Sequence, residues 1–383
     1  MKVLLLSAYA AHSHVSWERS LRAMFPHWQW QVLSLPPRHF SWRVRGNPLY
    51  WSLEERVALE RDYDLLVATS MVDLATLRGL VPSLARLPTL LYFHENQFDY
   101  PQQSVQPSLL EARMVSLYSA LAADCLAFNS AYNRDTFLAG VDALLRKLPD
   151  RVPGGVVAML EGKARVLPVP IDPVTGPAHW PGVAGCYPRR PLRLLWSGRF
   201  EHDKGGETLW HTLGELERGG LCYELALTGQ QFRRSPAVFG RIEAEFASRL
   251  VHFGYLPSEA DYRALLRGAD VLLSTARHEF QGLAVLEAVA SGCLPAVPDR
   301  QAYPEIYDQR FRYASCPDDP AREGAAAAAL VCALAEMRGR GGIAPPDVSA
   351  FTLAQLQPRY SELLLELAGP PGQASRRTGR APG

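Results

Sequence analysis

Two glutamates, Glu279 and Glu287, stand eight positions apart in the stretch STARHEFQGLAVLEAVASGCLP. The pattern predicts a strand, then a loop that carries Glu279, then a helix that opens at Gly282 and carries Glu287. Ionised carboxylates only accept hydrogen bonds, so they suit the vicinal hydroxyls of a hexose or a ribose. The free N–H groups of a helix start suit a phosphate. These groups together predict a site for a nucleotide sugar; the alternative is that Glu279 is a surface charge and Glu287 only supports its helix.

Two cations occupy a second stretch, LLWSGRFEHDKGGETL, at residues 194–209. A strand is predicted to end at Gly198, and Arg199 and Lys204 follow it ahead of a Gly-Gly pair and a helix. Arginine binds phosphate through a bidentate fork and lysine as a point charge, so the two suit a diphosphate. The alternative is a solvated charged loop, but two loops of complementary chemistry at strand ends favour a shared site.

Short apolar strands alternate with helical segments along the chain, which is the pattern of parallel sheets covered by helices. A stretch rich in proline and glycine at 171–191 predicts a linker. The predicted fold class is α/β, with two doubly wound Rossmann-like domains facing a central cleft at the carboxyl ends of their strands. Strands are predicted at 2–8, 30–36, 64–70, 89–95, 125–130 and 165–170, and again at 192–199, 223–229, 250–256, 270–275 and 294–298. The predicted parts are an N-terminal acceptor-side domain (1–170), the linker (171–191), a C-terminal nucleotide-sugar-binding domain (192–350), a helix at 353–367 that packs back near the N-terminal domain, and a disordered tail (369–383).

The composition is that of an ordinary globular protein, and it excludes several functions. The chain has 40 Lys and Arg against 39 Asp and Glu, so any nucleic-acid contact must come from a local basic patch. No apolar stretch approaches the roughly 20 residues that span a bilayer, and the short apolar run at the N-terminus predicts a strand instead of a signal peptide. The six cysteines lack metal-binding spacing, and the pair Asp62 and Asp64 precedes a strand, which is the wrong end for a ligand. We therefore expect a cytoplasmic protein with no membrane association and no required metal or cofactor.

The Glu-x7-Glu element and the arginine-lysine loop resemble the retaining GT-B glycosyltransferases, which use nucleotide sugars. The resemblance implies that Arg199 and Lys204 hold the diphosphate and stabilise it as it leaves. It also implies that Glu279 holds the donor hexose, that Glu287 holds the ribose, and that main-chain groups beside Tyr255 meet the base. The donor-binding residues implied are therefore Gly198, Arg199, Lys204, Tyr255, Glu279, Gly282, Leu283 and Glu287.

A closer resemblance covers nearly the whole chain. The stretches similar to the tRNA-queuosine mannosyltransferase family are YFHENQFDYP (92–101), AFNSAYNRDTFL (127–138), RFEHDK (199–204), FGYLPSEADY (253–262), TARHEFQGLAVLEAV (275–289) and YPEIY (303–307). This resemblance implies transfer of mannose from GDP-mannose to the queuosine base in the anticodon of aspartate tRNA, with retention of configuration. The chain departs from the expected pattern in lacking a glycine pair in the loop 9–17, and in having Gln281 where an aromatic residue is expected.

Candidate acceptor-side residues lie in the first half of the chain. His94 ends a predicted strand and is expected to contact the sugar or the developing charge, and Glu95 or Asn96 is expected to orient the acceptor hydroxyl. The alternative for His94 is a satisfied core residue. Ser13 and His14 are weaker candidates in the loop after the first strand. The stretch 36–51 is expected to be a loop that binds the anticodon through cations and stacked rings, and its candidate residues are Arg38, Trp42, Arg43 and Arg45.

The residues expected to be catalytic are His94, Arg199, Lys204 and Glu279. Two other functions stay open: a GT-B transferase that acts on a lipid or a polysaccharide, and a non-catalytic module that binds a nucleotide sugar or RNA. No protein partner is predicted. In the tail, Arg376, Arg377 and Arg380 would add nonspecific attraction for RNA.

Overall fold

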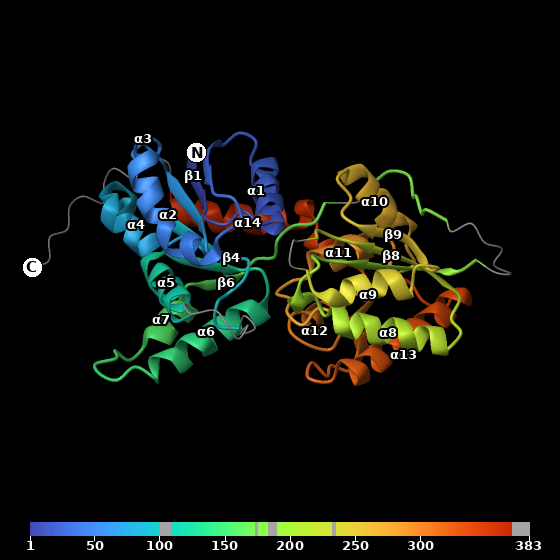
Figure 1. The fold of residues 1–383 in the computed structure, drawn as a ribbon. Helices are drawn as coiled ribbons and strands as arrows, with labels where there is room; N and C mark the ends of the chain where they lie inside the picture. Colours follow the sequence, from blue (N-terminus) through green and yellow to red (C-terminus); the bar gives the residue numbers. More distant parts are fainter. Residues whose placement is uncertain (100–108, 173–174, 183–189, 232–234, 370–383) are drawn as a thin grey trace, which may run out of the picture. The chain divides into compact units, whose positions relative to one another are not determined.

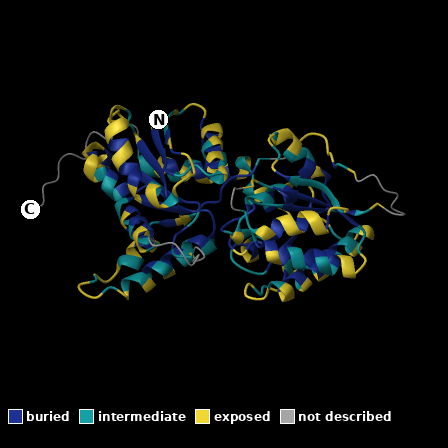
Figure 2. Ribbon diagram, in the orientation of Figure 1, coloured by how far each residue is buried: buried dark blue, intermediate teal, exposed yellow. Residues whose placement is uncertain are grey.

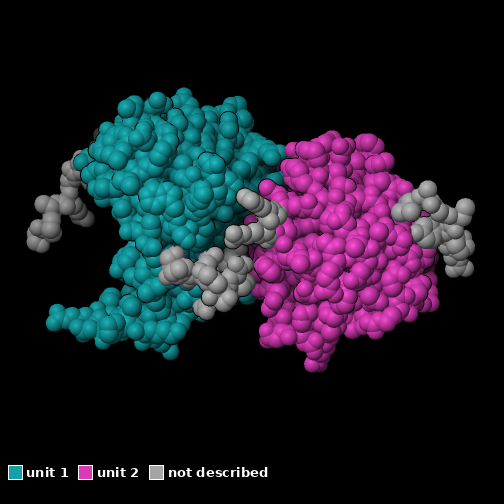
Figure 3. Space-filling model, viewed as in Figure 1, with its two compact units in different colours: residues 1–170, 353–383 teal, residues 171–352 magenta. Residues whose placement is uncertain are grey.

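The computed structural model describes residues 1–99, 109–172, 175–182, 190–231 and 235–369. The three tail arginines lie outside these ranges. The chain divides into two compact units, one of residues 1–170 with 353–383 and one of residues 171–352 (Figure 3). Within the described residues, each unit contains one parallel six-stranded sheet covered by helices (Figure 1). The predicted α/β class is therefore confirmed.

The sheet of unit 1 has the strand order β2-β1-β3-β4-β5-β6. Its central strands β3 and β4 are buried along their whole length, because their apolar residues are covered on both faces (Figure 2). The strands are β1 (Lys2–Ser7), β2 (Gln29–Ser34), β3 (Leu65–Thr69), β4 (Thr89–Phe93), β5 (Cys125–Phe128) and β6 (Ala164–Val166). The helices are α1 (His12–Met24), α2 (Phe40–Glu54), α3 (Arg56–Leu59), α4 (Leu74–Leu80), η1 (Pro82–Arg86), α5 (Leu109–Ala122), α6 (Ala131–Leu145), α7 (Val156–Gly162) and α14 (Leu353–Ala368).

Helix α14 returns to unit 1 from the far end of the sequence and packs against α1 and β4 (Figure 1). Its buried residues Leu356, Tyr360 and Leu364 recur every four positions and so share one face. The hydroxyl of Tyr360 accepts a hydrogen bond from the indole of Trp17 at 2.9 Å and donates to the carbonyl of Pro168 at 2.9 Å. These bonds tie the last helix to the first one.

The sheet of unit 2 has the strand order β12-β11-β10-β7-β8-β9, which makes β7 and β10 neighbours. Helices α8 and α13 lie side by side on one face of this sheet, and α10 lies on the other (Figure 1). The strands are β7 (Leu192–Ser197), β8 (Tyr223–Thr228), β9 (Leu250–Gly254), β10 (Val271–Leu273), β11 (Leu294–Pro298) and β12 (Arg312–Tyr313). The helices are η2 (His202–Lys204), α8 (Gly206–Arg218), α9 (Ala237–Glu245), α10 (Glu259–Gly268), α11 (Leu283–Ala290), α12 (Tyr303–Ile306), η3 (Gln309–Phe311), α13 (Pro320–Gly339) and η4 (Ser349–Phe351).

The stretch 36–51, predicted as a loop, is mostly helix α2. The sequence Gly46, Asn47, Pro48 is typical of a turn, because proline removes the N–H that would bond the carbonyl four residues earlier. The Asn47 side chain instead donates to that carbonyl, on Val44, at 3.0 Å. The helix therefore continues through the proline, and the loop prediction is wrong.

The segment after β1 is also helical where a loop was expected. Helix α1 begins at His12, so Ser13 and His14 lie in its first turn. Strand β12 was not predicted, because two residues are too few to form a recognisable alternation. No helix in the described ranges has the length and apolar character needed to cross a membrane.

Candidate active site

The predicted donor residues gather at one edge of the sheet of unit 2. Strand β7 ends at Ser197, and its neighbour β10 ends at Leu273. Because both strands are parallel, the loops that follow them start at the same edge. The loop after β7 carries Gly198, Arg199 and Lys204, and the loop after β10 carries Glu279, Gly282 and the start of α11 at Leu283.

The centre of this arrangement is the ammonium group of Lys204. Its Nζ lies 3.2 Å from Oδ2 of Asp203 and 3.2 Å from Oε2 of Glu279, and it donates to the carbonyl of His278 at 3.3 Å. Burial works to lower the pKa of Lys204, but the two carboxylates outweigh it and hold the pKa above its ordinary value. A lysine that is only 16% exposed therefore stays charged.

Backbone and side-chain bonds fix the two loops against each other. The hydroxyl of Thr275 donates to the carbonyl of Lys204 at 2.9 Å and accepts from the indole of Trp196 at 3.0 Å. The backbone N–H of Arg277 donates to the carbonyl of Asp203 at 2.8 Å. These bonds therefore hold Lys204 next to Glu279, in addition to the attraction between their charges.

Helix α11 opens at a glycine that the structure requires. Gly282 has φ +78°, in the left-handed region, and a Cβ there would lie 2.9 Å from the ring of Tyr303. As a glycine, Gly282 has no side chain that could cap the helix. The N–H groups at its start, beside Leu283, are thus positioned as an anion site would need.

Glu287 lies on α11 beside a tyrosine that the sequence pattern did not single out. The hydroxyl of Tyr262, on α10, donates to Oε2 of Glu287 at 3.4 Å and lies 3.2 Å from Oγ of Ser197. Burial raises the pKa of Glu287 from 4.5 to about 7, although the bond from Tyr262 opposes this. Glu287 is therefore a carboxyl group that changes its charge near neutral pH.

The remaining donor candidates lie at the surface of the same edge. Arg199 is 42% exposed, and its Nη2 lies 3.1 Å from Oε2 of Glu201. Tyr255 follows β9 directly and is 64% exposed. Gly198 follows β7, and its backbone N–H donates to the carbonyl of Thr228 at 3.0 Å.

In unit 1, two histidines form a buried stack at the end of β4. The rings of His14 and His94 are 4.0 Å apart between centroids and nearly parallel, and Nε2 of His14 lies 3.3 Å from Oε2 of Glu95. His94 is 4% exposed, and neither of its ring nitrogens has a hydrogen-bond partner among the described residues. Burial, reinforced by His14, holds the pKa of His94 well below its usual value. His94 is therefore a neutral, buried imidazole whose two ring nitrogens bond no described residue.

Asn96 belongs to the support of this loop. It is 1% exposed, and its amide donates to the carbonyl and side chain of Asn133 at 3.1 and 2.9 Å. Asn129, bonded in turn to Asn133 at 2.8 Å, donates to the carbonyl of His94 at 2.8 Å. The Asn96 amide therefore holds this loop in place, and its role toward an acceptor hydroxyl stays a prediction.

Among the candidate RNA-binding residues near α2, some are exposed and one forms ion pairs within unit 1. Arg38 and Trp42 are exposed, the latter at 55%, and Arg43 is half-buried. Arg45 pairs with the buried carboxylate of Asp73 and lies 3.1 Å from Oε1 of Glu111. Arg45 thus joins α2 to α4 and α5, but its side chain is 44% exposed, and its contact with an RNA phosphate stays a prediction.

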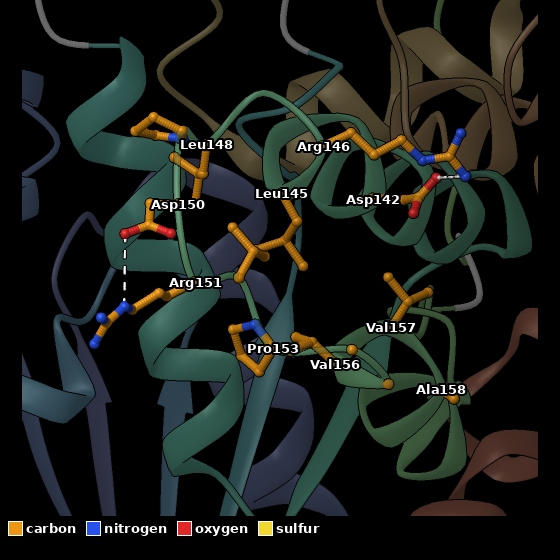
Figure 4. A pocket seen from close by; sticks show the side chains of 14 residues that line it. Asp142, Leu145, Arg146, Leu148, Asp150, Arg151, Pro153, Val156, Val157 and Ala158 are labelled. Carbon is orange, nitrogen blue, oxygen red and sulfur yellow. Dashed lines mark ion pairs between the residues drawn. The ribbon is translucent and has the colours of Figure 1, made fainter.

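The described residues contain no metal cluster, and a hollow found in unit 1 lies apart from the predicted site residues. No group of three His, Cys, Asp or Glu within the described ranges is placed to hold a metal ion, and Asp64 accepts from the backbone N–H of Lys2 at 2.7 Å. A hollow of about 610 Å³ lies between α6 and α7 (Figure 4). It contains the ion pairs Asp142–Arg146 and Asp150–Arg151 and none of the predicted site residues.

Solved structures resemble the chain in their fold. HepE from Anabaena, solved with UDP, has a TM-score of 0.61 at 14% identity, with 95% of this chain and 99% of that chain covered. A glycosyltransferase from Rickettsia africae has a TM-score of 0.60 at 13% identity, with 96% and 98% covered. With two parallel sheets in separate units, the chain has the fold of the GT-B glycosyltransferases.

Sequence comparison narrows the class to a family. Residues 2–171 match the profile described as tRNA-queuosine alpha-mannosyltransferase N-terminal, and residues 154–300 match family 4 glycosyltransferases in conflict systems. The tRNA-queuosine alpha-mannosyltransferase of Drosophila melanogaster is 32% identical over 315 residues, which cover 81% of this chain and 83% of the relative. The chain therefore belongs to the tRNA-queuosine alpha-mannosyltransferase family, and it is a glycosyltransferase.

Proposed function

We propose that this enzyme transfers mannose from GDP-mannose to the queuosine base in the anticodon of aspartate tRNA, with retention of configuration. The observation that supports the proposal most strongly is the charged, mostly buried Lys204, which lies 3.2 Å from Glu279 beside the opening of α11. A cation, a helix start and a carboxylate at one sheet edge suit the diphosphate and hexose of a nucleotide sugar.

On the donor side, Lys204 and Arg199 would hold the diphosphate and stabilise it as its bond to the sugar breaks. Glu279 would accept hydrogen bonds from the hexose hydroxyls and Glu287 from the ribose hydroxyls. Backbone groups at Gly198, Gly282, Leu283 and Tyr255 would complete the contacts with the phosphate, the sugar and the base.

His94, a residue of unit 1, would form a hydrogen bond with the transferred sugar. A neutral imidazole whose nitrogens bond no described residue can accept a hydrogen bond from a sugar hydroxyl at one nitrogen or donate one from the other, without placing a positive charge beside the oxocarbenium-like centre. His14 and Glu95 lie directly against it, and Ser13 shares the first turn of α1 with His14. The acceptor hydroxyl would attack from the face that the diphosphate leaves, and no metal is required in this scheme.

The tRNA would contact exposed cations and rings of unit 1. Arg38, Trp42 and Arg43 are the candidates near the start of α2, since cations serve phosphates and an exposed indole can stack on an unpaired base. A tRNA acceptor also makes the cytoplasm the expected location.

The test is transfer of radiolabelled mannose from GDP-mannose to purified tRNA. We expect label in aspartate tRNA from a queuosine-containing strain, and none in tRNA from a matched strain that lacks queuosine. UDP-glucose serves as the control donor. Label that enters only lipid or polysaccharide, or donor binding without any transfer, would replace the proposed function with one of the two alternatives.

We predict that donor binding weakens as the pH falls below about 7, because Glu287 must be ionised to accept from the ribose and its pKa is about 7. Each pH unit below that value should raise the Kd for GDP-mannose about tenfold. Titration calorimetry between pH 5.5 and pH 8.5 measures this dependence. In Glu287→Gln the Kd should be higher at pH 8 and nearly constant with pH; a wild-type Kd that is constant across the range would contradict the prediction.

A further inference from the structure

Gln301, just after β11, has a backbone conformation that glutamine rarely adopts. Its φ is +56°, and only two other non-glycine residues in the described part of the chain have a positive φ. The left-handed conformation costs a residue with a Cβ roughly 1 kcal/mol relative to glycine. A strained residue of this kind persists where its side chain supplies something that glycine lacks.

The Gln301 side chain forms hydrogen bonds with the residues on either side of His278, in the loop that carries Glu279. Its Oε1 accepts from the backbone N–H of Glu279 at 2.7 Å, and its Nε2 donates to the carbonyl of Arg277 at 2.8 Å. One amide thereby holds a donor and an acceptor of the loop at once. The loop between Ser274 and Gly282 has no helix or strand of its own, so such bonds decide where the Glu279 side chain begins.

Arg300, the residue before Gln301, is itself held in place by buried contacts. The guanidinium of Arg300 donates twice to the carbonyl of Ala276, at 2.7 and 3.0 Å, and pairs with the fully buried carboxylate of Glu323. Glu323 also accepts from the backbone N–H of Cys316 at 3.0 Å. Arg300 thus ties the segment after β11 to the loop after β10, and its ion pair with Glu323 anchors both in the interior of unit 2.

We propose that Gln301 is a positioning residue that sets the Glu279 carboxylate at its distance from Lys204, and so fixes the donor hexose for transfer. The inference rests on the proposed function, in which Glu279 holds the hexose. A carboxylate that is 26% exposed and extends from an irregular loop would otherwise sample several positions. Catalysis is sensitive to such freedom, because a misplacement of about 1 Å can cost about 100-fold in rate.

The variant Gln301→Gly separates positioning from folding. Glycine accepts φ +56° without strain, which offsets the loss of the two side-chain hydrogen bonds, so the melting temperature should change by only a few degrees. We expect kcat/KM for mannosyl transfer to fall about 10- to 100-fold, with the fall largely in kcat. The Glu279 amide, which loses its acceptor, should exchange its hydrogen on the order of 10 times faster. Gln309→Gly, at an exposed position of unit 2, is the control for activity and exchange, and it should leave kcat/KM and the exchange rate of the Glu279 amide unchanged.

A double-variant cycle completes the test. If Gln301 acts through Glu279, Gln301→Gly should cause little further loss when added to Glu279→Ala. Wild-type kcat/KM in Gln301→Gly, or full additivity with Glu279→Ala, would overturn the inference. Failure of the proposed function has a different signature, because wild-type enzyme would then not label tRNA at all. The exchange rate of the Glu279 amide and the affinity for GDP-mannose would still show whether Gln301 positions the loop.

Discussion

Replacing Lys204 with alanine is expected to lower kcat/KM for mannosyl transfer by about 100- to 1000-fold. The ammonium group would stabilise charge on the diphosphate as it leaves, in a site where little solvent replaces it, since Lys204 is 16% exposed. The loss should be larger than for an exposed cation because the two carboxylates beside it, Asp203 and Glu279, would remain without their partner. They would repel both each other and the anionic donor.

Initial rates with GDP-mannose and queuosine-containing tRNA measure this loss, and titration with GDP-mannose measures the accompanying fall in donor affinity. Lys147→Ala removes an exposed lysine of unit 1 and should leave both quantities unchanged. Lys204→Arg should recover only part of the activity, because a planar fork does not fit the three acceptors that surround one Nζ. A rate within about threefold of wild type in Lys204→Ala would remove Lys204 from the donor site.

The donor half of the site was predictable because it follows from topology. In a parallel sheet every carboxyl end lies at one edge, so polar residues just after strands converge whatever the strand order. Lys204 and Glu279 are 75 positions apart, yet their side chains meet at 3.2 Å. Tyr262 was missed because it lies in a helix, where no strand-end pattern marks it. Gln301 follows the predicted strand 294–298, but the sequence does not show that its side chain bonds the loop that carries Glu279.

The acceptor-side residues were less predictable because their roles depend on partners distant in sequence. His94 and Asn96 both follow the same strand, but the buried ring nitrogens of His94 bond no described residue, whereas the Asn96 amide bonds Asn133. Only the packing of α6 against this loop distinguishes them. In the same way, nothing local shows that Arg45 pairs with Asp73, or that Asn47 replaces the bond that Pro48 removes.

Gly205→Ala is expected to damage both the fold of unit 2 and transfer. Gly205 has φ +69°, and an added Cβ would overlap the carbonyl oxygen of Thr275 and lie 2.9 Å from its carbonyl carbon. The obstacle is backbone next to a buried strand, so the turn and not the strand must move. That movement would break the bond from Thr275 to the Lys204 carbonyl and carry Lys204 away from Glu279.

We expect Gly205→Ala to lower the melting temperature by several degrees and kcat/KM by about 100-fold. Thermal unfolding and initial rates measure the two effects. Gly214→Ala is the control: Gly214 lies inside helix α8, which begins directly after Gly205, and no heavy atom lies within 4 Å of its added Cβ. Alanine at Gly214 should stabilise the helix by roughly 0.5–1 kcal/mol. Opposite signs for these two Gly→Ala substitutions would show that Gly205 is required by the close approach to Thr275. Wild-type stability and rate in Gly205→Ala would instead mean that Lys204 reaches the donor without this contact.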